Sequence, residues 1–481
     1  MTMSSSIEAH FNAFSPRLNR RPITFPAVAL HGGALLALVV LTAQAWGQTG
    51  IFAWSVGLAY LTYDTVLLIF VGVQTLPLRH FVPRPPDASA RPTLAVLIAA
   101  HNEAAVLEQT IRALLAQQDP PDIILIADDG STDPTPATME RAFAIPAPPY
   151  GELASSPTVL PLRWLRLPHG GKARALNAAL EAIDSDIVLT VDADTILAPD
   201  AIAAMRTAFH REPALVAATG LLRPICDRSI AGRMFEWFQT YEYVRNFISR
   251  FAWMRIDGLL LISGAFAGFR REAVVAVGGF DPECLVEDYE LIHRLHRWSV
   301  DHDHGWKVRV VGEPRAYTDA PGHIGAFLRQ RQRWFGGFLQ TQYWNRDMVG
   351  NPRFGRLGTM MLPVKAFDTV QPLFGLVAFA LLVGFALGGR LPVVGPILIA
   401  MLAKVAIDLG FHAWSIILYR RWSGGMLPEG WSRVIAASFV EPFTFQLLRH
   451  LGAALGWIAF LTRSSTWTKA KRGGLLARAE A

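Results

Sequence analysis

The feature that most constrains how this chain can fold is a long stretch, from Ile23 to Tyr63, without any Asp, Glu, Lys or Arg. After Asp64 the apolar sequence continues to Leu78. A helix needs ~20 apolar residues to cross a bilayer, so we predict two crossings, at about 26–45 and 52–75. Residues 23–78 are therefore predicted to be two transmembrane helices, and the polar residues 1–22 a mobile cytoplasmic tail.

Membrane character returns after residue 356. Apolar residues fill 369–388 and 392–419, whereas Glu441-Pro442 and Arg449-His450 interrupt a further apolar region at 434–462. The interrupted region is open to two interpretations, a hairpin or an interfacial segment. We predict interface and transmembrane helices over 356–462 and a polar tail over 463–481.

Composition and charge support membrane association rather than nucleic-acid binding. The chain is 52% hydrophobic and only 17% charged, below the roughly 25% charged residues of an average soluble domain. The net charge is +6, but the cations lie beside apolar segments, where they orient helices in a membrane. Arg17, Arg20 and Arg21 precede the first crossing and predict a cytoplasmic amino terminus. We expect a lipid bilayer and no nucleic acid among the partners.

The middle of the chain has the composition of a soluble domain. A proline-rich linker at 79–92 precedes a predicted α/β domain at 93–355. Apolar runs of strand length alternate there with helical patterns, which favours a parallel sheet built from βαβ units. The predicted strands are 94–99, 123–127, 187–191 and 215–219, the predicted helices are 103–116, 171–183 and 199–210, and 146–161 is a predicted surface insertion.

Carboxylates follow three of these strands. Asp192 and Asp194 follow 187–191, Glu103 comes after the first strand with Asn102, and Asp128 and Asp129 come after the second. Carboxyl ends of parallel strands form the ligand-binding edge of open sheets, and a divalent cation would offset the repulsion between these groups. Two alternatives remain open: a helix N-cap at 192–194 and a plain turn at 128–131.

A glycine pair opens the helix predicted at 171–183. In the segment 169–177, Gly170 and Gly171 would let the backbone approach a ligand, and Lys172 adds a positive charge at a helix amino terminus, which favours phosphate. The spacing is neither that of a Walker A loop nor that of a dinucleotide-binding loop. A surface helix start with solvated cations is the alternative.

Two further motifs lie near the end of the domain. Glu287-Asp288 opens an amphipathic helix, where acidic residues also serve as ordinary capping groups. Gln330, Arg331, Arg333 and Trp334 precede the second membrane region. Arginines suit pyrophosphate, whereas the alternative for this segment is a basic, aromatic helix at the membrane interface.

In this order, the four motifs at 128–130, 192–194, 287–288 and 330–334 resemble those of the membrane-bound, processive family 2 glycosyltransferases. That family includes cellulose, hyaluronan, chitin and poly-N-acetylglucosamine synthases. The resemblance implies a Rossmann-like α/β GT-A catalytic domain, cytoplasmic, joined to an α-helical transmembrane region in a bacterial-type inner membrane. The arrangement of spans is most similar to that of bacterial poly-N-acetylglucosamine synthases, and 464–469 resembles the Trp-bearing tail of parts of this group.

The resemblance also implies roles for the candidate residues. Asp288 would be the general base, with Glu287 beside it, and Asp192 and Asp194 would hold Mg²⁺ or Mn²⁺. The implied donor-binding residues are Asn102, Glu103, Asp128, Asp129, Lys172 and Asp192. The implied acceptor and pyrophosphate residues are Gln330, Arg331, Arg333 and Trp334.

We therefore expect an inverting enzyme that polymerises a β-linked polysaccharide from UDP-GlcNAc or UDP-glucose and extrudes it through the membrane. Its partners would be the UDP-sugar, the growing glycan and an accessory or export subunit. The alternatives are a non-processive transferase acting on a lipid carrier and a transporter with a nucleotide-sensing domain. Charges are costly in lipid, so some of Asp64, Lys404, Asp408 and Glu441 are expected to line a glycan channel.

Overall fold

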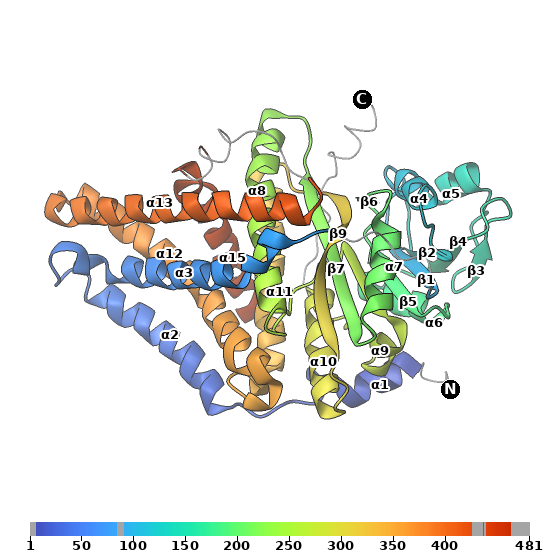
Figure 1. Cartoon of the computed structure of the whole chain (residues 1–481), viewed down its shortest axis with the longest axis horizontal. Helices are drawn as coiled ribbons and strands as arrows, with labels where there is room; N and C mark the ends of the chain where they lie inside the picture. Colours follow the sequence, from blue (N-terminus) through green and yellow to red (C-terminus); the bar gives the residue numbers. More distant parts are fainter. Residues whose placement is uncertain (1–5, 84–90, 426–435, 437–438, 463–481) are drawn as a thin grey trace.

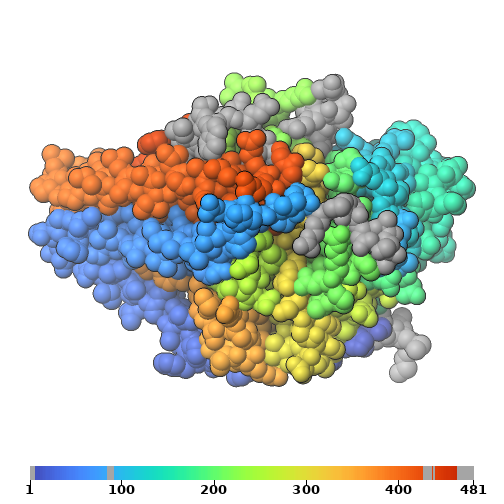
Figure 2. Space-filling model, viewed as in Figure 1, coloured from blue at the N-terminus to red at the C-terminus, as the bar shows by residue number. Residues whose placement is uncertain are grey.

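The computed structural model describes residues 6–83, 91–425, 436 and 439–462. A sheet with its covering helices forms one side of the molecule, and a set of long helices extends from it on the other side (Figure 1). In the space-filling view α13 (Leu391–Trp422) runs along one border of this helical part above the amino-terminal helices (Figure 2). Residues 84–90 of the predicted linker and the predicted tail at 463–481, with its segment 464–469, lie outside the described residues.

The predicted α/β domain is confirmed, and its sheet has nine strands in the order β3-β4-β2-β1-β5-β8-β7-β9-β6. One half is parallel and has the βαβ form that the sequence predicts. Its strands are β4 (Leu162–Leu167), β2 (Ile123–Asp129), β1 (Leu94–Ala100) and β5 (Ile187–Val191). Its helices are α4 (Leu107–Leu115), α5 (Thr135–Phe143) and α6 (Lys172–Glu181).

The other half makes the sheet mixed, which differs from the parallel sheet that we predicted. β8 (Phe266–Arg270) is antiparallel to both β5 and β7 (Leu215–Ile225), because a long helix carries the chain back before it re-enters the sheet. β9 (Lys307–Asp319) is parallel to β7 and pairs with β6 (Thr195–Leu197), and β3 (Leu153–Ser155), inside the predicted insertion, is the edge strand beside β4.

These strand directions gather many chain segments at one edge of the sheet. Val191, at the end of β5, pairs with Phe266, at the start of β8, so the loop before β8 lies where β1, β2 and β5 end. β7 and β9 run parallel to each other and antiparallel to β8, so they also end at this edge. Charged residues after β1, β2, β5 and β9 can therefore meet there.

Helices cover the sheet and link it to the membrane helices. They are α7 (Ala201–Arg211), α8 (Ile230–Met254), α9 (Arg271–Ala276), α10 (Glu287–Asp301) and α11 (Ile324–Trp344). Ser229 caps α8 by accepting a hydrogen bond of 2.9 Å from the Gly232 N–H, which satisfies one of the backbone donors that a helix start leaves open. In Figure 1, α8 and α11 stand between the sheet and the membrane helices.

Among the described residues, four helical segments are long and apolar enough to cross a membrane: Phe25–Ala43, Gly50–His80, Leu357–Leu387 and Leu391–Trp422. They contain α2 (Phe25–Ala43), α3 (Ser55–Gln74), α12 (Leu362–Leu387) and α13. In the region whose topology the sequence left open, a short turn at Glu441–Phe443 leads into α15 (Phe445–Leu461). α15 lies so close to α11 that a Cβ on Gly452 would stand 2.4 Å from the Cβ of Arg331.

The described part of the amino-terminal segment packs against the α/β domain, which differs from the mobile tail that we predicted. Residues Ser6–Phe14 form α1, and Ile7 and Phe11 on one face of it are buried. Gly278 has a φ of +88°, and a Cβ there would lie 2.3 Å from the Phe11 nitrogen, so only glycine leaves room for α1. Arg17 then forms two hydrogen bonds, of 2.8 and 3.0 Å, with the buried carboxylate of Asp281.

Candidate active site

A cavity of about 1290 Å³ opens at the edge where the strands end and reaches into the membrane helices. It brings together most of the predicted site residues, from both ends of the domain. Those that line it are Glu103, Asp129, Lys172, Asp192, Asp194, Glu287, Asp288, Gln330, Arg331, Arg333 and Trp334. Asn102 and Asp128 are not among the lining residues.

Asp129, the last residue of β2, holds the glycine loop that opens α6. Its Oδ1 accepts a hydrogen bond of 2.7 Å from the Gly170 N–H, and its Oδ2 accepts one of 3.0 Å from the Gly171 N–H. The Nδ1 of His169 lies 2.9 Å from the same Oδ2, and the His169 ring stacks on His101 with centroids 4.4 Å apart. His101, Asp129 and His169 are also close enough to hold a metal ion, but Asp129 is already engaged by the loop backbone.

Asn102 and Asp128 shape the loops behind the cavity wall. Asn102 has a φ of +57°, and its Oδ1 accepts hydrogen bonds from the N–H groups of Thr132 (2.7 Å) and Asp133 (3.1 Å). Asp128 is buried, and its Oδ1 accepts a hydrogen bond of 2.9 Å from the Ser131 N–H. Asp128 is therefore a turn residue, as the alternative interpretation of 128–131 predicted, whereas its neighbour Asp129 borders the cavity.

Lys172 is the first residue of α6 and connects two of the predicted motifs. Its Nζ lies 2.7 Å from Asp192 Oδ1 and 3.3 Å from Glu287 Oε1. Burial acts to lower the pKa of Lys172, but the carboxylates of Asp192 and Glu287 outweigh burial and hold the pKa well above its ordinary value. The ammonium group therefore stays charged and holds the acidic groups of two motifs together. The alternative of a solvated surface cation is therefore wrong for Lys172.

Asp192 and Asp194 follow β5 and border the cavity, each half-buried. The chain continues from them into strand β6, and α7 begins only at Ala201 with Asp200 as its N-cap residue, so the N-cap alternative for 192–194 is wrong. The Asp192 N–H donates to the Ala265 carbonyl oxygen at 3.3 Å, which fixes the turn to the loop before β8. Two carboxylates beside an open cavity are hard oxygen ligands that suit Mg²⁺ or Mn²⁺.

Asp288 lies in the first turn of α10, and two backbone N–H groups hold its carboxylate. Gly264 donates to Oδ2 at 2.7 Å and Tyr289 donates to Oδ1 at 2.8 Å. A Cβ on Gly264 would stand 3.0 Å from that Oδ2, so the loop before β8 packs directly on the carboxylate. Burial and the adjacent Glu287 raise the pKa of Asp288 above its ordinary value, against the opposing effect of Lys172 and the backbone donors.

The two arginines of the fourth motif have different surroundings. Arg331 forms two hydrogen bonds of 2.8 Å with Glu242 of α8, and its guanidinium lies 4.4 Å from the Trp334 ring centroid. Arg333 donates at 3.0 Å to the carbonyl oxygen of Leu285, just before Glu287. Arg331 thus joins α11 to α8, whereas Arg333 joins α11 to the loop that leads to the acidic motif.

Several residues that line the cavity were missed by the sequence analysis. They come mainly from one face of α8, which carries Glu242, Tyr243 and Arg250, and from the end of β9, which carries Thr318 and Asp319. Nothing in their spacing marks them, because α8 has the pattern of an ordinary amphipathic helix. A polar residue at the end of a strand was a usable signal for Asp319, but β9 itself was not predicted.

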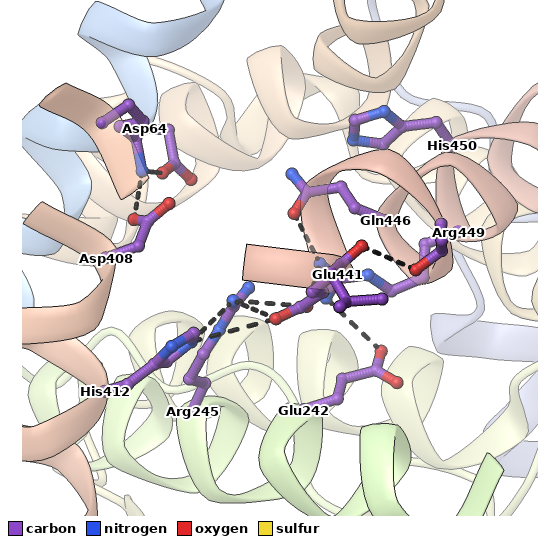
Figure 3. Close-up of polar contacts among 12 residues, drawn as sticks. Asp64, Glu242, Arg245, Asp408, His412, Glu441, Gln446, Arg449 and His450 are labelled. Carbon is purple, nitrogen blue, oxygen red and sulfur yellow. Dashed lines mark hydrogen bonds and ion pairs between the residues drawn. The ribbon is translucent and has the colours of Figure 1, made fainter. Parts of the chain in front are cut away.

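Figure 3 shows two groups of polar residues near the apolar helices, one around Asp64 and Asp408 and one around Glu441. Lys404 pairs with Asp64 at 2.6 Å and also with Asp408. Lys404 thus links Asp408, on its own helix, to Asp64 on α3.

Glu441 belongs to the second group. It lies 3.0 Å from Arg449 and 3.4 Å from Arg245, and His412 is its neighbour at 4.0 Å. Of the four residues expected to line a channel, Asp64 borders the cavity, whereas Lys404, Asp408 and Glu441 do not.

Acidic and basic groups thus meet at the carboxyl edge of a mixed sheet, beside a cavity that continues among apolar helices. Residues 92–337 match the family described as "Glycosyltransferase like family 2". The chain belongs to this family, and its catalytic region has the GT-A fold.

Two relatives whose descriptions state an activity are similar to part of this chain. The chain is 29% identical over 266 residues to the poly-beta-1,6-N-acetyl-D-glucosamine synthase of Staphylococcus aureus, an alignment that covers 55% of this chain and 59% of that protein. It is 28% identical over 259 residues to the synthase of the same description from Staphylococcus epidermidis, covering 52% and 57%.

A solved structure supports the fold. The mannosyltransferase PcManGT of Pyrobaculum calidifontis, in complex with GDP-Man and Mn²⁺, superposes with a TM-score of 0.55 and 21% identity, covering 82% of this chain and 99% of that one. At this identity the likeness concerns the fold.

Proposed function

We propose that this chain is an inverting, processive glycosyltransferase that lengthens a β-linked polysaccharide from a UDP-sugar, with UDP-GlcNAc as the first donor to test. One observation carries the proposal: a single cavity joins Lys172, Asp192 and Asp288 to polar residues of the membrane helices such as Asp64. A donor and a growing chain can then occupy one continuous space. The likeness to poly-N-acetylglucosamine synthases supports the choice of donor.

The donor would lie against the parallel half of the sheet. Asp129 and the glycine loop offer a rigid wall for the uridine, with Glu103 beside them, and Asn102 and Asp128 contribute by holding these loops in shape. Lys172 would bind the diphosphate at the amino terminus of α6, where the helix dipole also favours negative charge. Arg333 and Gln330 would face the diphosphate from α11.

A divalent cation fits the carboxylates of Asp192 and Asp194, because hard oxygen ligands at the border of a cavity suit Mg²⁺ and Mn²⁺ alike. When bound, such an ion would neutralise charge on the donor diphosphate. Lys172 already contacts one oxygen of Asp192, so a bound ion and the lysine would share this carboxylate.

Asp288 would act on the acceptor. Its carboxylate takes the proton of the acceptor hydroxyl as that oxygen bonds to the anomeric carbon and the bond from this carbon to the diphosphate oxygen breaks. Attack opposite the leaving UDP inverts the configuration. The N–H groups of Gly264 and Tyr289 hold the base in place, and Glu287 keeps Lys172 beside it.

The acceptor chain would pass from Asp288 past Trp334 toward α3 and α15. Gln446, His450 and Asp64 border this end of the cavity and offer hydrogen bonds to sugar hydroxyls. Arg17, Arg20 and Arg21 favour a cytoplasmic amino terminus and catalytic domain by the distribution of positive charge. The chain would thus synthesise the glycan at the inner face of a bacterial plasma membrane, with an accessory or export subunit as a partner.

To test this proposal, purified full-length protein is incubated with Mn²⁺ or Mg²⁺ and with several nucleotide sugars in parallel reactions. UDP release and product length are then measured in each reaction. Long polymer and UDP from one UDP-sugar support the proposal. Single-sugar transfer to a lipid carrier would support the non-processive alternative, and binding of a UDP-sugar without any UDP release would support the nucleotide-sensing transporter. Loss of activity in EDTA, restored by Mn²⁺ or Mg²⁺, tests the metal.

A further inference from the structure

Arg250, on the face of α8 that borders the cavity, has an unusual environment. Its Nε and Nη1 are buried and have no hydrogen-bond partner, and among the described residues it is the one arginine with two such nitrogens. Its guanidinium lies 4.7 Å from the Phe247 ring centroid, one helical turn earlier, so a cation–π contact fixes the side chain. Two buried donors without acceptors destabilise the folded protein unless a ligand satisfies them.

The other cations around the cavity are already paired. Lys172 contacts Asp192, Arg331 contacts Glu242, and Lys365 contacts Asp368 at 2.8 Å. Arg245 and Arg449 share Glu441, Arg333 donates to a backbone carbonyl, and Arg329 is exposed. Arg250 thus keeps two buried donors, Nε and Nη1, available to a molecule in the cavity, whereas Arg331 and Arg449 each keep one, Nε.

Burial lowers the pKa of Arg250 to about 10, against the opposing influence of Tyr243 and Asp288. The guanidinium therefore remains charged at neutral pH. Arg250 and Asp288 line the same cavity, and the charge of Asp288 is one of those that act on the guanidinium.

Neighbours on α8 indicate the chemistry of the ligand. Tyr243, Asn246 and Arg250 recur at helical spacing along the cavity, with Phe247 and Trp253 between and beyond them. Residues three and four apart share one face of a helix. This face combines aromatic rings with an amide and a guanidinium, which suits a neutral sugar with hydroxyl and acetamido oxygens better than it suits a second diphosphate.

We propose that Arg250 forms an acceptor-sugar subsite, in which it donates hydrogen bonds to hydroxyl or acetamido oxygens of the terminal sugar and directs its attacking hydroxyl toward Asp288. The inference rests on the proposed function and extends it to a residue outside the four motifs. Arg250 is here a specificity-determining residue, and the donor is held elsewhere in the cavity.

The test compares wild type with Arg250→Met, Arg250→Lys and the control Arg255→Met, which changes an exposed arginine just past the end of the same helix. UDP release from UDP-GlcNAc is measured with Mn²⁺ at varied concentrations of a short β-1,6-linked N-acetylglucosamine oligosaccharide. In Arg250→Met we expect the KM for the oligosaccharide to rise about tenfold, from the loss of hydrogen bonds to a charged group, while the KM for UDP-GlcNAc stays within twofold. Arg250→Lys keeps the charge, so its KM for the oligosaccharide should lie between those of wild type and Arg250→Met. Arg255→Met should have the KM values of wild type.

An unchanged oligosaccharide KM in Arg250→Met overturns the subsite, and so does an increase in the KM for UDP-GlcNAc of similar size, which would place Arg250 on the diphosphate. Calorimetric binding of UDP shows that each variant is folded. Calorimetric binding of the oligosaccharide without donor tests the subsite apart from the reaction: weaker binding by Arg250→Met supports it, and equal binding contradicts it. A wild-type protein that releases no UDP from any nucleotide sugar contradicts the proposed function instead.

Discussion

The ammonium group of Lys172 lies 2.7 Å from Asp192 and 3.3 Å from Glu287, so one cation joins the residue after β5 to the first residue of α10. These carboxylates belong to motifs 95 positions apart in the sequence, from 192 to 287. The lysine therefore has a second role besides the proposed contact with the diphosphate, since it keeps the metal motif and the base motif at a fixed spacing.

Replacing Lys172 by methionine should lower kcat/KM for the UDP-sugar at least about a hundredfold, because a charge-assisted contact is lost and two neighbouring carboxylates are left without their cation. Steady-state UDP release measures the effect. Arg174→Met is the control, since Arg174 is on the exposed face of the same helix and lies 3.9 Å from the exposed Glu283. Equal losses in both variants would contradict the special position of Lys172.

Asp288→Asn should lower kcat by about 10²- to 10⁴-fold, the usual contribution of a general base, and leave UDP binding close to that of wild type. The amide keeps the shape of the side chain but cannot take the acceptor proton. Asp301→Asn, at the far end of α10, is the matched control because Asp301 is exposed. Turnover by Asp288→Asn at the wild-type rate would remove Asp288 from the mechanism.

The pH dependence of kcat should report the same carboxylate. A base works only when deprotonated, so activity falls as the pH falls through its pKa. Because burial and Glu287 raise the pKa of Asp288, this fall should begin at a higher pH than for an ordinary aspartate. Glu287→Gln removes one of the raising charges and should move the acid limb of the profile to lower pH. A limb that stays in place or moves upward would contradict this prediction.

Asp64 and Glu441 should behave differently from each other. Glu441 is buried among Arg245, Arg449 and His412, so Glu441→Gln leaves buried cations uncompensated and should lower stability by ~3–5 kcal/mol, seen as a lower melting temperature in detergent. Asp64 borders the cavity and pairs with Lys404, which keeps Asp408 as a second partner. Asp64→Asn should therefore cost less stability than Glu441→Gln, while it shortens the polymer or reduces its export. Full-length export by Asp64→Asn would argue against a glycan path beside Asp64.

Arg17→Ala should destabilise the catalytic domain, because the buried carboxylate of Asp281 loses two charge-assisted hydrogen bonds, each worth ~1.5–3 kcal/mol. Hydrogen exchange should increase over 277–286, the loop before Glu287. Arg20→Ala, an exposed neighbour, is the control. Equal exchange in the two variants would mean that the contact does not hold the loop.

The parts of the structure that repeat a local pattern were predictable from sequence. Strand-length apolar runs predicted β1, β2 and β5 closely, and the residues that follow them do gather at one edge. The antiparallel return of β8 was not predictable in this way, because the direction of a strand depends on the path of the chain through α8. Asn102 and Asp128 carry side chains of the right kind, but hydrogen bonds within their loops turn them away from the cavity.

Functional residues that belong to no sequence motif could not be predicted from the sequence. Arg250 and Glu242 lie on a helix of ordinary composition, and their positions at the cavity follow from how α8 packs between the sheet and the membrane helices. The amino-terminal segment did offer a signal, since Ile7 and Phe11 are one helical turn apart on an otherwise polar segment. Its binding site, however, is a loop 264 positions from Arg17, and no local pattern links the two.

This distance along the chain also has a consequence for the order of biosynthesis. α1 leaves the ribosome before the first membrane helix, yet the glycines and the carboxylate that receive it are made only after most of the catalytic domain. During translation α1 is therefore without its binding site until residues 278–281 have been made, and the loop before Glu287 is complete only after α1 has packed against it.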